Sequence, residues 1–188
     1  MHMLKAGLGD MLAKYISICE WRISTLINGE YYCETVAGMI REALAKCMKY
    51  SDGLLKRDEQ AVGAVFEGLV MAGIAVNYAG LSRPASGIEH YISHIWDMRS
   101  HEFGTYEDLH GIQCAVGTLI SVKLYERLMK IVPNREKALA AAAAFDWEEH
   151  CAMLREFLGR SAESMIAQEA KEQKFNIEKH AARLERIL

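Results

Sequence analysis

The sequence has very little proline: Pro84 and Pro133 are the only two in 188 residues. Runs of β-branched residues are also scarce, whereas alanine, leucine, methionine, lysine and glutamate are abundant. These abundant residues keep most of their side-chain freedom in a helix, and proline is the residue that interrupts a helix most strongly. The two shortages argue against a β-rich fold, and the sequence predicts an all-α domain built as a helical bundle.

Several patterns that mark particular functions are missing. No Gly-x-Gly-x-x-Gly follows a strand, so these residues do not predict a dinucleotide-binding unit. No Cys-x-x-Cys pair and no signal peptide are visible. The cysteines form an odd, dispersed set, which is typical of reduced thiols in a cytoplasmic protein rather than of a disulfide framework. They are Cys19, Cys33, Cys47, Cys114 and Cys151.

Neither long apolar runs nor an excess of one charge is present. The formal net charge is −3 with acids and bases interspersed, so nothing favours a nucleic-acid partner. The most apolar run, from Gly68 to Ala75, is too short to span a bilayer, and we expect no membrane insertion. With 51% hydrophobic and 25% charged residues the chain is not disordered. Its length predicts a single domain, which we place at residues 4–188.

The spacing of apolar residues predicts a series of helices. The first extends from Leu4 to Ile27, and the second follows Glu34. A third, from about Arg57 to Tyr78, is apolar on most sides, which is typical of a helix at the centre of a bundle. A fourth helix is expected after Ser82 or Ser86, either of which can cap it, with Pro84 in an early position. A polar loop at 101–108 follows it. Four more helices are expected: from His110 to before Pro133, from Asn134 through the alanines at 138–144, at 147–158, and from Ser161 to the end.

Four of the seven histidines lie close together in the sequence, at positions 90, 94, 101 and 110. His90 and His94 are four residues apart, which places both imidazoles on one face of a helix. His110 follows after a loop and precedes Gly111. Two imidazoles from different elements, together with one carboxylate, form a catalytic metal site that keeps one position open. Asp10 supplies the candidate carboxylate, and His94 is the candidate proton relay.

Each of these residues also has a plain structural explanation. His90 and His94 can be polar-face residues, and His110 can simply begin a helix. For Asp10 the alternative is an N-terminal helix cap, for which aspartate is a preferred residue. The residues alone leave both interpretations open.

Three motifs occur in a fixed order. They are Ala-Gly-Leu-Gly-Asp-Met-Leu-Ala-Lys-Tyr at 6–15, the segment at 77–96 that ends in His-Tyr-Ile-Ser-His-Ile-Trp, and Leu-His-Gly-Ile-Gln at 109–113. Together they resemble the C-terminal half of the sn-glycerol-1-phosphate dehydrogenases, in their bacterial branch. That family is similar to glycerol dehydrogenases, iron-containing alcohol dehydrogenases and dehydroquinate synthases. The resemblance runs from about Leu4 to Tyr125 and continues more weakly to the end.

The resemblance implies one divalent metal ion (Zn, Ni or Fe) held by Asp10, His90 and His110, with His94 lining the active site. It implies NAD(P) as cofactor and, as substrate, the phosphorylated three-carbon pair dihydroxyacetone phosphate and sn-glycerol 1-phosphate. Arg83, with Ser82 behind it, is the candidate for binding the phosphate, and a surface salt bridge is the alternative for Arg83.

The family also has an N-terminal Rossmann-like domain for the nucleotide, which these residues do not include. The residues that bind NAD(P) are therefore not predicted, and we expect the fragment alone to be inactive. A cytoplasmic location is expected, and the resemblance allows a homo-oligomer. The alternatives are another metal-dependent polyol or alcohol dehydrogenase, a dehydroquinate-synthase-like lyase, and a non-enzymatic helical interaction module. The segment from Ser82 to Gly87 favours the phosphate-handling branch.

Overall fold

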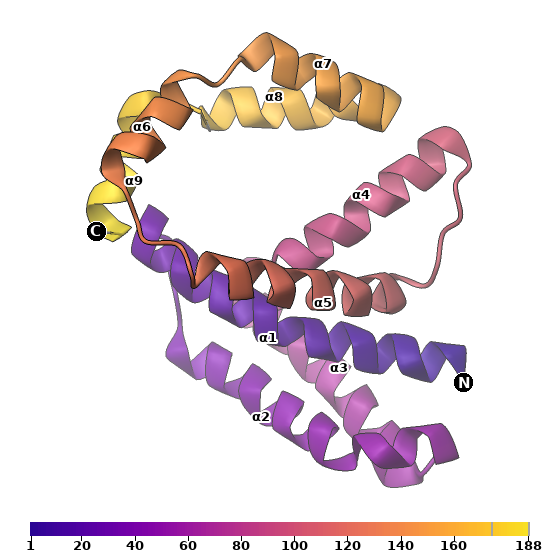
Figure 1. The fold of residues 1–188 in the computed structure, drawn as a ribbon. Coiled ribbons are helices and arrows are strands. Elements are labelled where there is room, and N and C mark those ends of the chain that lie inside the picture. The colour runs from indigo at the N-terminus through magenta and orange to yellow at the C-terminus, as the bar shows by residue number, and fades with distance from the viewer. Residues whose placement is uncertain (174, 188) are drawn as a thin grey trace. The chain divides into compact units, whose positions relative to one another are not determined.

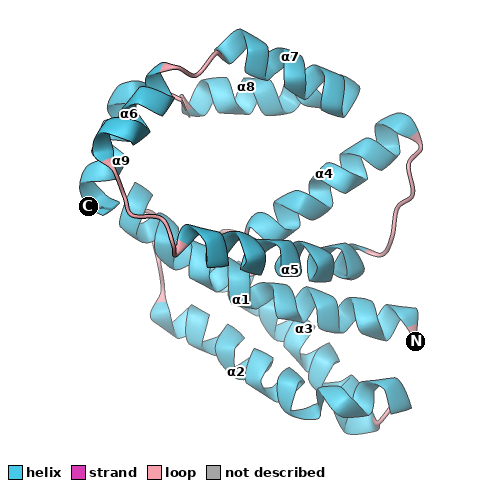
Figure 2. Ribbon diagram, viewed as in Figure 1, coloured by secondary structure: helices cyan, strands magenta, loops and turns pink. Residues whose placement is uncertain are grey.

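The computed structural model describes residues 1–173 and 175–187, and these contain helices, turns and loops but no strand (Figure 2). The predicted all-α class is confirmed. The α-helices are α1 (His2–Asn28), α2 (Glu34–Tyr50), α3 (Glu59–Ala79), α4 (Ile88–Phe103), α5 (His110–Leu128), α6 (Arg135–Ala143), α7 (Trp147–Leu158), α8 (Ala162–Glu172) and α9 (Ile177–Ile187), with short 3-10 helices at Ser51–Lys56 and Gly159–Ser161.

The helices group into two compact units. The first comprises residues 1–25, 29–94 and 108–129, and the second comprises residues 26–28, 95–107 and the residues from 130 onwards. Compact units within one fold do not by themselves define separate domains, so the single domain at 4–188 stays a prediction.

The core of the first unit joins α1 to the α2–α3 pair (Figure 1). Trp21 and Met11 of α1 are fully buried there, together with Ile40 and Leu44 of α2. The Trp21 indole also donates a hydrogen bond to the carbonyl of Tyr31, at 2.6 Å. Each large apolar side chain buried in this way contributes about 1.5–3 kcal/mol. This packing holds α1, and therefore Asp10, in a fixed place.

The prediction that the third helix lies at the centre of the bundle is wrong. One face of α3 is buried, but its opposite face exposes Phe66, Val70, Ile74 and Tyr78. Composition alone does not reveal which side of a helix the rest of the chain covers, and in this unit α1 is the more buried helix. Within the described residues, α3 alone is long and apolar enough to cross a membrane by length and composition, a test that core helices of soluble proteins also pass.

Several helix boundaries also differ from the sequence-based prediction. The cap interpretation of Asp10 is wrong, because α1 begins at His2 and Asp10 lies inside it. Pro84 lies in a turn before α4, which begins at Ile88 and continues through His101 into the predicted loop. The last predicted helix is divided into α8 and α9. By contrast, Asn134 caps α6 as predicted, because its side chain accepts the N–H of Lys137.

The second unit has a small apolar core of its own. Leu154 and Leu158 of α7 and Ala162 of α8 are buried there. Ile95 and Met98, in the second half of α4, pack against them.

Candidate metal centre

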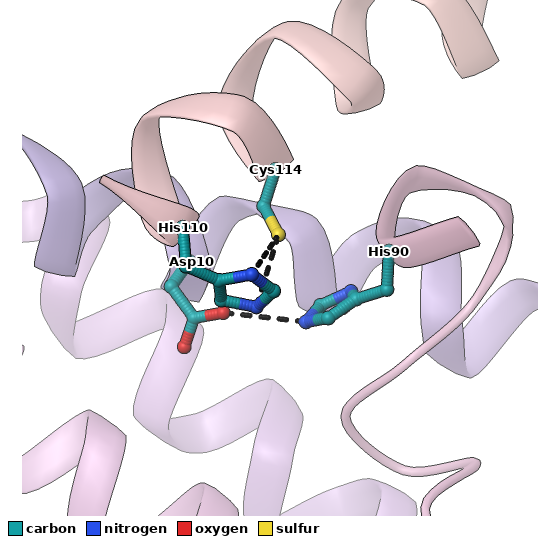
Figure 3. Close-up of side chains that lie close together, drawn as sticks. All are labelled: Asp10, His90, His110 and Cys114. Atoms are coloured by element: carbon teal, nitrogen blue, oxygen red, sulfur yellow. Dashed lines mark hydrogen bonds and ion pairs between the residues drawn. The ribbon is translucent and has the colours of Figure 1, made fainter. Parts of the chain in front are cut away.

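Four potential metal ligands lie together in the first unit (Figure 3). Asp10 comes from α1, His90 from α4, and His110 and Cys114 from α5. One donor atom of each lies within 4.8 Å of the others. Oδ1 of Asp10 is 3.4 Å from Nε2 of His90. The structure thus brings together the three residues singled out from the sequence and adds a cysteine that sequence reasoning missed.

Two glycines allow α1 and α5 to approach closely enough for this cluster to form. A Cβ atom built on Gly111 would lie 1.9 Å from the carbonyl oxygen of Ala6. A Cβ atom on Gly9 would lie 2.3 Å from the carbonyl oxygen of Gly111. Gly9 directly precedes Asp10, and Gly111 directly follows His110. The backbone contact of the two helices therefore places the carboxylate beside the imidazole.

A buried carboxylate orients the ring of His90. Glu89 is 0% exposed, and its Oε1 lies 2.8 Å from Nδ1 of His90 while also accepting the N–H of Gly87 at 2.9 Å. Because Glu89 accepts the Nδ1 proton, this network assigns Nε2 as the nitrogen that faces Asp10. A carboxylate behind a histidine in this way fixes the tautomer and raises the basicity of the ligand nitrogen.

A second network orients the ring of His110. The Ser93 hydroxyl donates to Oε1 of Gln113 at 2.7 Å, so its oxygen accepts from Nδ1 of His110 at 3.0 Å. Gln113 is itself held by a hydrogen bond from its amide nitrogen to the carbonyl of Asp108. Nε2 of His110 is therefore left to face Cys114, at 3.4 Å from Sγ. Both histidines thus present Nε2 to the cluster.

Glutamates, rather than the predicted serines, satisfy the first N–H groups of α4. Glu20 accepts the N–H of Ile88 at 3.0 Å and the hydroxyl of Tyr125 at 2.9 Å. Burial raises the pKa of Glu20, and burial together with Glu20 raises the pKa of Tyr125. Oε2 of Glu89 is buried with no hydrogen-bond partner in the described part of the chain. Negative charge at this helix end is favoured by the helix dipole.

Asp10 lies beside two groups that can carry positive charge, His90 and Lys14. Burial on its own raises the pKa of Asp10, but hydrogen bonds with His90 and with Lys14 outweigh it and lower this pKa to about 2. Burial likewise lowers the pKa of His90, but its hydrogen bonds, chiefly that with Asp10, raise it to about 10. At this pKa His90 carries a proton at neutral pH, and a metal ion that binds Nε2 would have to displace it. Lys14, only 2% exposed and 3.0 Å from Asp10, offsets part of the negative charge. Carboxylate, imidazole and thiol donors together fit a borderline divalent ion such as zinc.

The other predicted site residues lie outside this cluster. His94 is exposed, and its ring centre is 5.8 Å from that of His110 and 6.5 Å from that of His90. Arg83 forms a two-pronged ion pair with Glu30, through Nε at 2.9 Å and Nη2 at 2.8 Å. Ser82 is exposed, and its carbonyl oxygen closes the turn that contains Pro84. The geometry of Arg83 is that of the salt bridge named as the alternative, and a phosphate-binding role stays a prediction.

We expect the stability of the metal-free chain and its affinity for metal to depend on pH in opposite directions. The pKa of His90 is about 10 when folded, against an ordinary value of 6.5. Its contribution to the free energy of unfolding is therefore fully present below about pH 6.5 and is lost as the pH rises towards 10, by up to about 1.4 kcal/mol per pH unit. A metal ion must displace the same proton, so affinity for Zn²⁺ rises over this window by at least about tenfold per pH unit, each displaced proton contributing a factor of about ten.

Urea unfolding of the metal-free chain and competitive zinc titration at several pH values measure the two slopes. His90→Gln should remove the slope in stability, whereas His101→Gln should preserve it. Zinc affinity that stays constant across the window would contradict the assignment of a proton to His90.

The fold and the cluster define a class: an all-helical chain with a candidate divalent-metal centre built from three helices. No protein-family model matches the chain. It is 38% identical over 124 residues to glycerol-1-phosphate dehydrogenase (NAD(P)+) of Halalkalibacterium halodurans, covering 66% of this chain and 31% of that protein. The enzyme of the same name from Geobacillus stearothermophilus is 32% identical over 160 residues, covering 83% of this chain and 40% of that protein. The enzyme of that name from Thermococcus sibiricus is 36% identical over 138 residues, covering 73% of this chain and 38% of that protein.

The chain belongs to the glycerol-1-phosphate dehydrogenase family and corresponds to the C-terminal part of its members. It spans 31% to 46% of the length of the curated relatives it matches.

Proposed function

We propose that the chain is the metal-binding part of an NAD(P)-dependent oxidoreductase that interconverts dihydroxyacetone phosphate and sn-glycerol 1-phosphate. The names of the relatives support the reaction and the nicotinamide cofactor. The observation that carries the proposal is the cluster itself. Asp10, His90 and His110 come from three separate helices and meet with their donor atoms facing one another.

In the proposed mechanism, Asp10 and the two Nε2 atoms of His90 and His110 would hold one divalent ion: zinc, nickel or iron. When bound, the ion supplies a Lewis acid that polarises the C2 oxygen of the substrate. Glu89 and Ser93 keep the two rings oriented through their Nδ1 protons. His94, exposed beside His110, would pass a proton between this oxygen and solvent, a role that histidine fills most often among side chains.

The remaining parts of the proposal concern the rest of the substrate and the rest of the enzyme. Arg83 with Ser82 would bind the substrate phosphate. To do so, the Arg83 guanidinium must bind the phosphate alongside Glu30 or break its ion pair with Glu30. The nucleotide would be presented by the part of the relatives that this chain does not match. Without that part, the chain alone should not turn over. A cytoplasmic location and assembly into a homo-oligomer belong to the same proposal.

Removing the carboxylate tests the metal site. We expect the purified chain to retain about one zinc ion after dialysis, and Asp10→Asn to weaken zinc binding by at least about 100-fold, because a direct ligand matters more than the outer-shell partners that cost about 10–100-fold. Asp52→Asn, an exposed residue of the first 3-10 helix, is the control. Elemental analysis and competitive titration measure both. The site proposal fails if the wild-type chain takes up no metal or if Asp10→Asn binds it as well.

A chimaera tests the substrate. The part of the Halalkalibacterium halodurans enzyme that precedes the matched region is fused to this chain, and oxidation of NADH and NADPH is followed. We expect activity with dihydroxyacetone phosphate and none with unphosphorylated dihydroxyacetone, and no activity from the chain alone. A chimaera that acts on glycerol but not on its phosphate would instead favour the polyol dehydrogenase alternative.

A further inference from the structure

The metal centre contains one donor more than the proposed chemistry needs. Cys114 lies on α5 four residues after His110, so the two side chains share one face of that helix. The thiol is buried, whereas the ring of His110 is exposed. Figure 3 shows the sulfur of Cys114 pointing towards the ring of His110.

We propose that Cys114 is the fourth ligand of the ion, so that in the absence of substrate the coordination shell is closed by a thiolate. This inference rests on the proposed function only in requiring that an ion binds at Asp10, His90 and His110. It adds a sulfur ligand to a site otherwise made of oxygen and nitrogen.

The distances support a single tetrahedral shell. With ligand bonds of about 2.0–2.1 Å to nitrogen or oxygen and about 2.3 Å to sulfur, the edges of a zinc tetrahedron are about 3.3–3.6 Å. Two donor pairs match this length: Asp10 Oδ1 to His90 Nε2 at 3.4 Å, and Cys114 Sγ to His110 Nε2 at 3.4 Å. The whole set lies within 4.8 Å, so modest side-chain adjustments complete the tetrahedron.

A comparison within the chain separates Cys114 from an ordinary core cysteine. Cys47 is also buried, but it packs in the apolar core, and its thiol donates to the carbonyl of Ala64 at 3.2 Å. The sulfur of Cys114 instead lies against imidazole nitrogen, 3.4 Å from Nε2 of His110. A buried sulfur next to a nitrogen that is itself a proposed ligand occupies the position expected of a metal ligand.

This ligand would set which ions the site prefers. Thiolate is a soft ligand that favours zinc, cobalt and iron over magnesium and manganese. It would also make the substrate oxygen a fifth ligand or a replacement for sulfur, and zinc sites do expand to five-coordinate during catalysis. Because His110 is the exposed member of the cluster, the substrate would approach from the side of His110.

Cobalt spectroscopy tests this inference without any catalytic assay. Co²⁺ is titrated into the wild-type chain, Cys114→Ser, Cys114→Ala and Cys19→Ser, whose cysteine is exposed on α1 and serves as the control. We expect a near-ultraviolet sulfur-to-cobalt charge-transfer band in the wild type and in Cys19→Ser, and its loss in both Cys114 variants. Those variants should still bind Co²⁺, at least tenfold more weakly, and should lose most of the preference for Zn²⁺ over Mn²⁺.

X-ray absorption of the zinc-loaded chain gives a second readout. One sulfur scatterer at about 2.3 Å is expected, and it should be missing in Cys114→Ser. Stoichiometric cobalt without a charge-transfer band, or a band that survives Cys114→Ser, overturns the role of Cys114 while leaving the three-residue site intact. A wild-type chain that binds no cobalt overturns both this inference and the proposed function. Unfolding of the metal-free Cys114→Ser variant shows whether its core is preserved.

Discussion

Replacing Gly111 with alanine should abolish stoichiometric metal binding and destabilise the chain. The new methyl group would lie 1.9 Å from the carbonyl oxygen of Ala6. This oxygen belongs to the backbone, so it cannot move aside by a change of side-chain rotamer. A carbon and an oxygen atom need about 3.3 Å, so α1 and α5 must separate by more than about 1 Å. Overpacking of this kind costs about 1–3 kcal/mol, and a metal site tolerates errors of only about 0.5 Å. We expect at least about 100-fold weaker zinc binding.

Two further glycine substitutions complete the experiment. Gly9→Ala meets the same contact from the other helix, at 2.3 Å from the carbonyl oxygen of Gly111, and should reproduce the loss. Gly73→Ala is the matched control, because a Cβ there has none of the described atoms within 4 Å and alanine favours a helix by about 1 kcal/mol. Urea unfolding and competitive zinc titration report the two effects. Normal zinc affinity in Gly111→Ala would show that the site does not depend on the close approach of α1 and α5.

The second large effect is expected from Glu89→Gln, which should weaken zinc binding by about 10–100-fold without lowering stability. The neutral amide keeps the shape of the side chain but is a weaker acceptor for the Nδ1 proton of His90, so the ligand nitrogen becomes less basic. The weaker bond with His90 costs some stability, but Oε2 of Glu89 has no hydrogen-bond partner among the described residues, and the Glu89 charge adds to burial in raising the pKa of Glu20. Removing that charge relieves repulsion between two buried carboxylates.

The combination of the two results distinguishes an orienting role from a merely structural one. Glu42→Gln, an exposed substitution on α2, should change neither the zinc affinity nor the unfolding free energy. A loss of stability in Glu89→Gln that matches its loss of zinc affinity would show that Glu89 acts by holding the fold. Unchanged zinc affinity would show that the contact with His90 has no influence on the ligand.

The helices were largely predictable, because their signals are local. Scarce proline, apolar spacing and the cap at Asn134 are local features that lie within a few residues of the helix they define. The face that α3 exposes was not predictable, because it depends on what the rest of the chain covers. The start of α4 was wrong for the same reason: Glu20, far away in the sequence, supplies the acceptor expected from Ser82 or Ser86.

The candidate site was predictable as far as its motifs reach. Asp10, His90 and His110 each stand in a short recognisable segment, and the structure places them together. Cys114 carried a usable signal, since it follows His110 at the spacing that marked His90 and His94, but the cysteines were interpreted only as dispersed reduced thiols. The roles of Ser93, Gln113 and Lys14 depend on pairings between helices that no local pattern encodes.

The glycine contact between α1 and α5 also determines the order of events during biosynthesis. Asp10 is synthesised long before Cys114, and the adjacent helices α2 and α3 pair locally while the later residues are still being made. The metal centre forms only after α5 has docked onto α1. In the nascent chain its four donor residues are therefore still far apart, and they do not yet select one cation over another. Ion selection must then be a property of the finished fold, which implies that the chain can be emptied with a chelator and refilled without being unfolded.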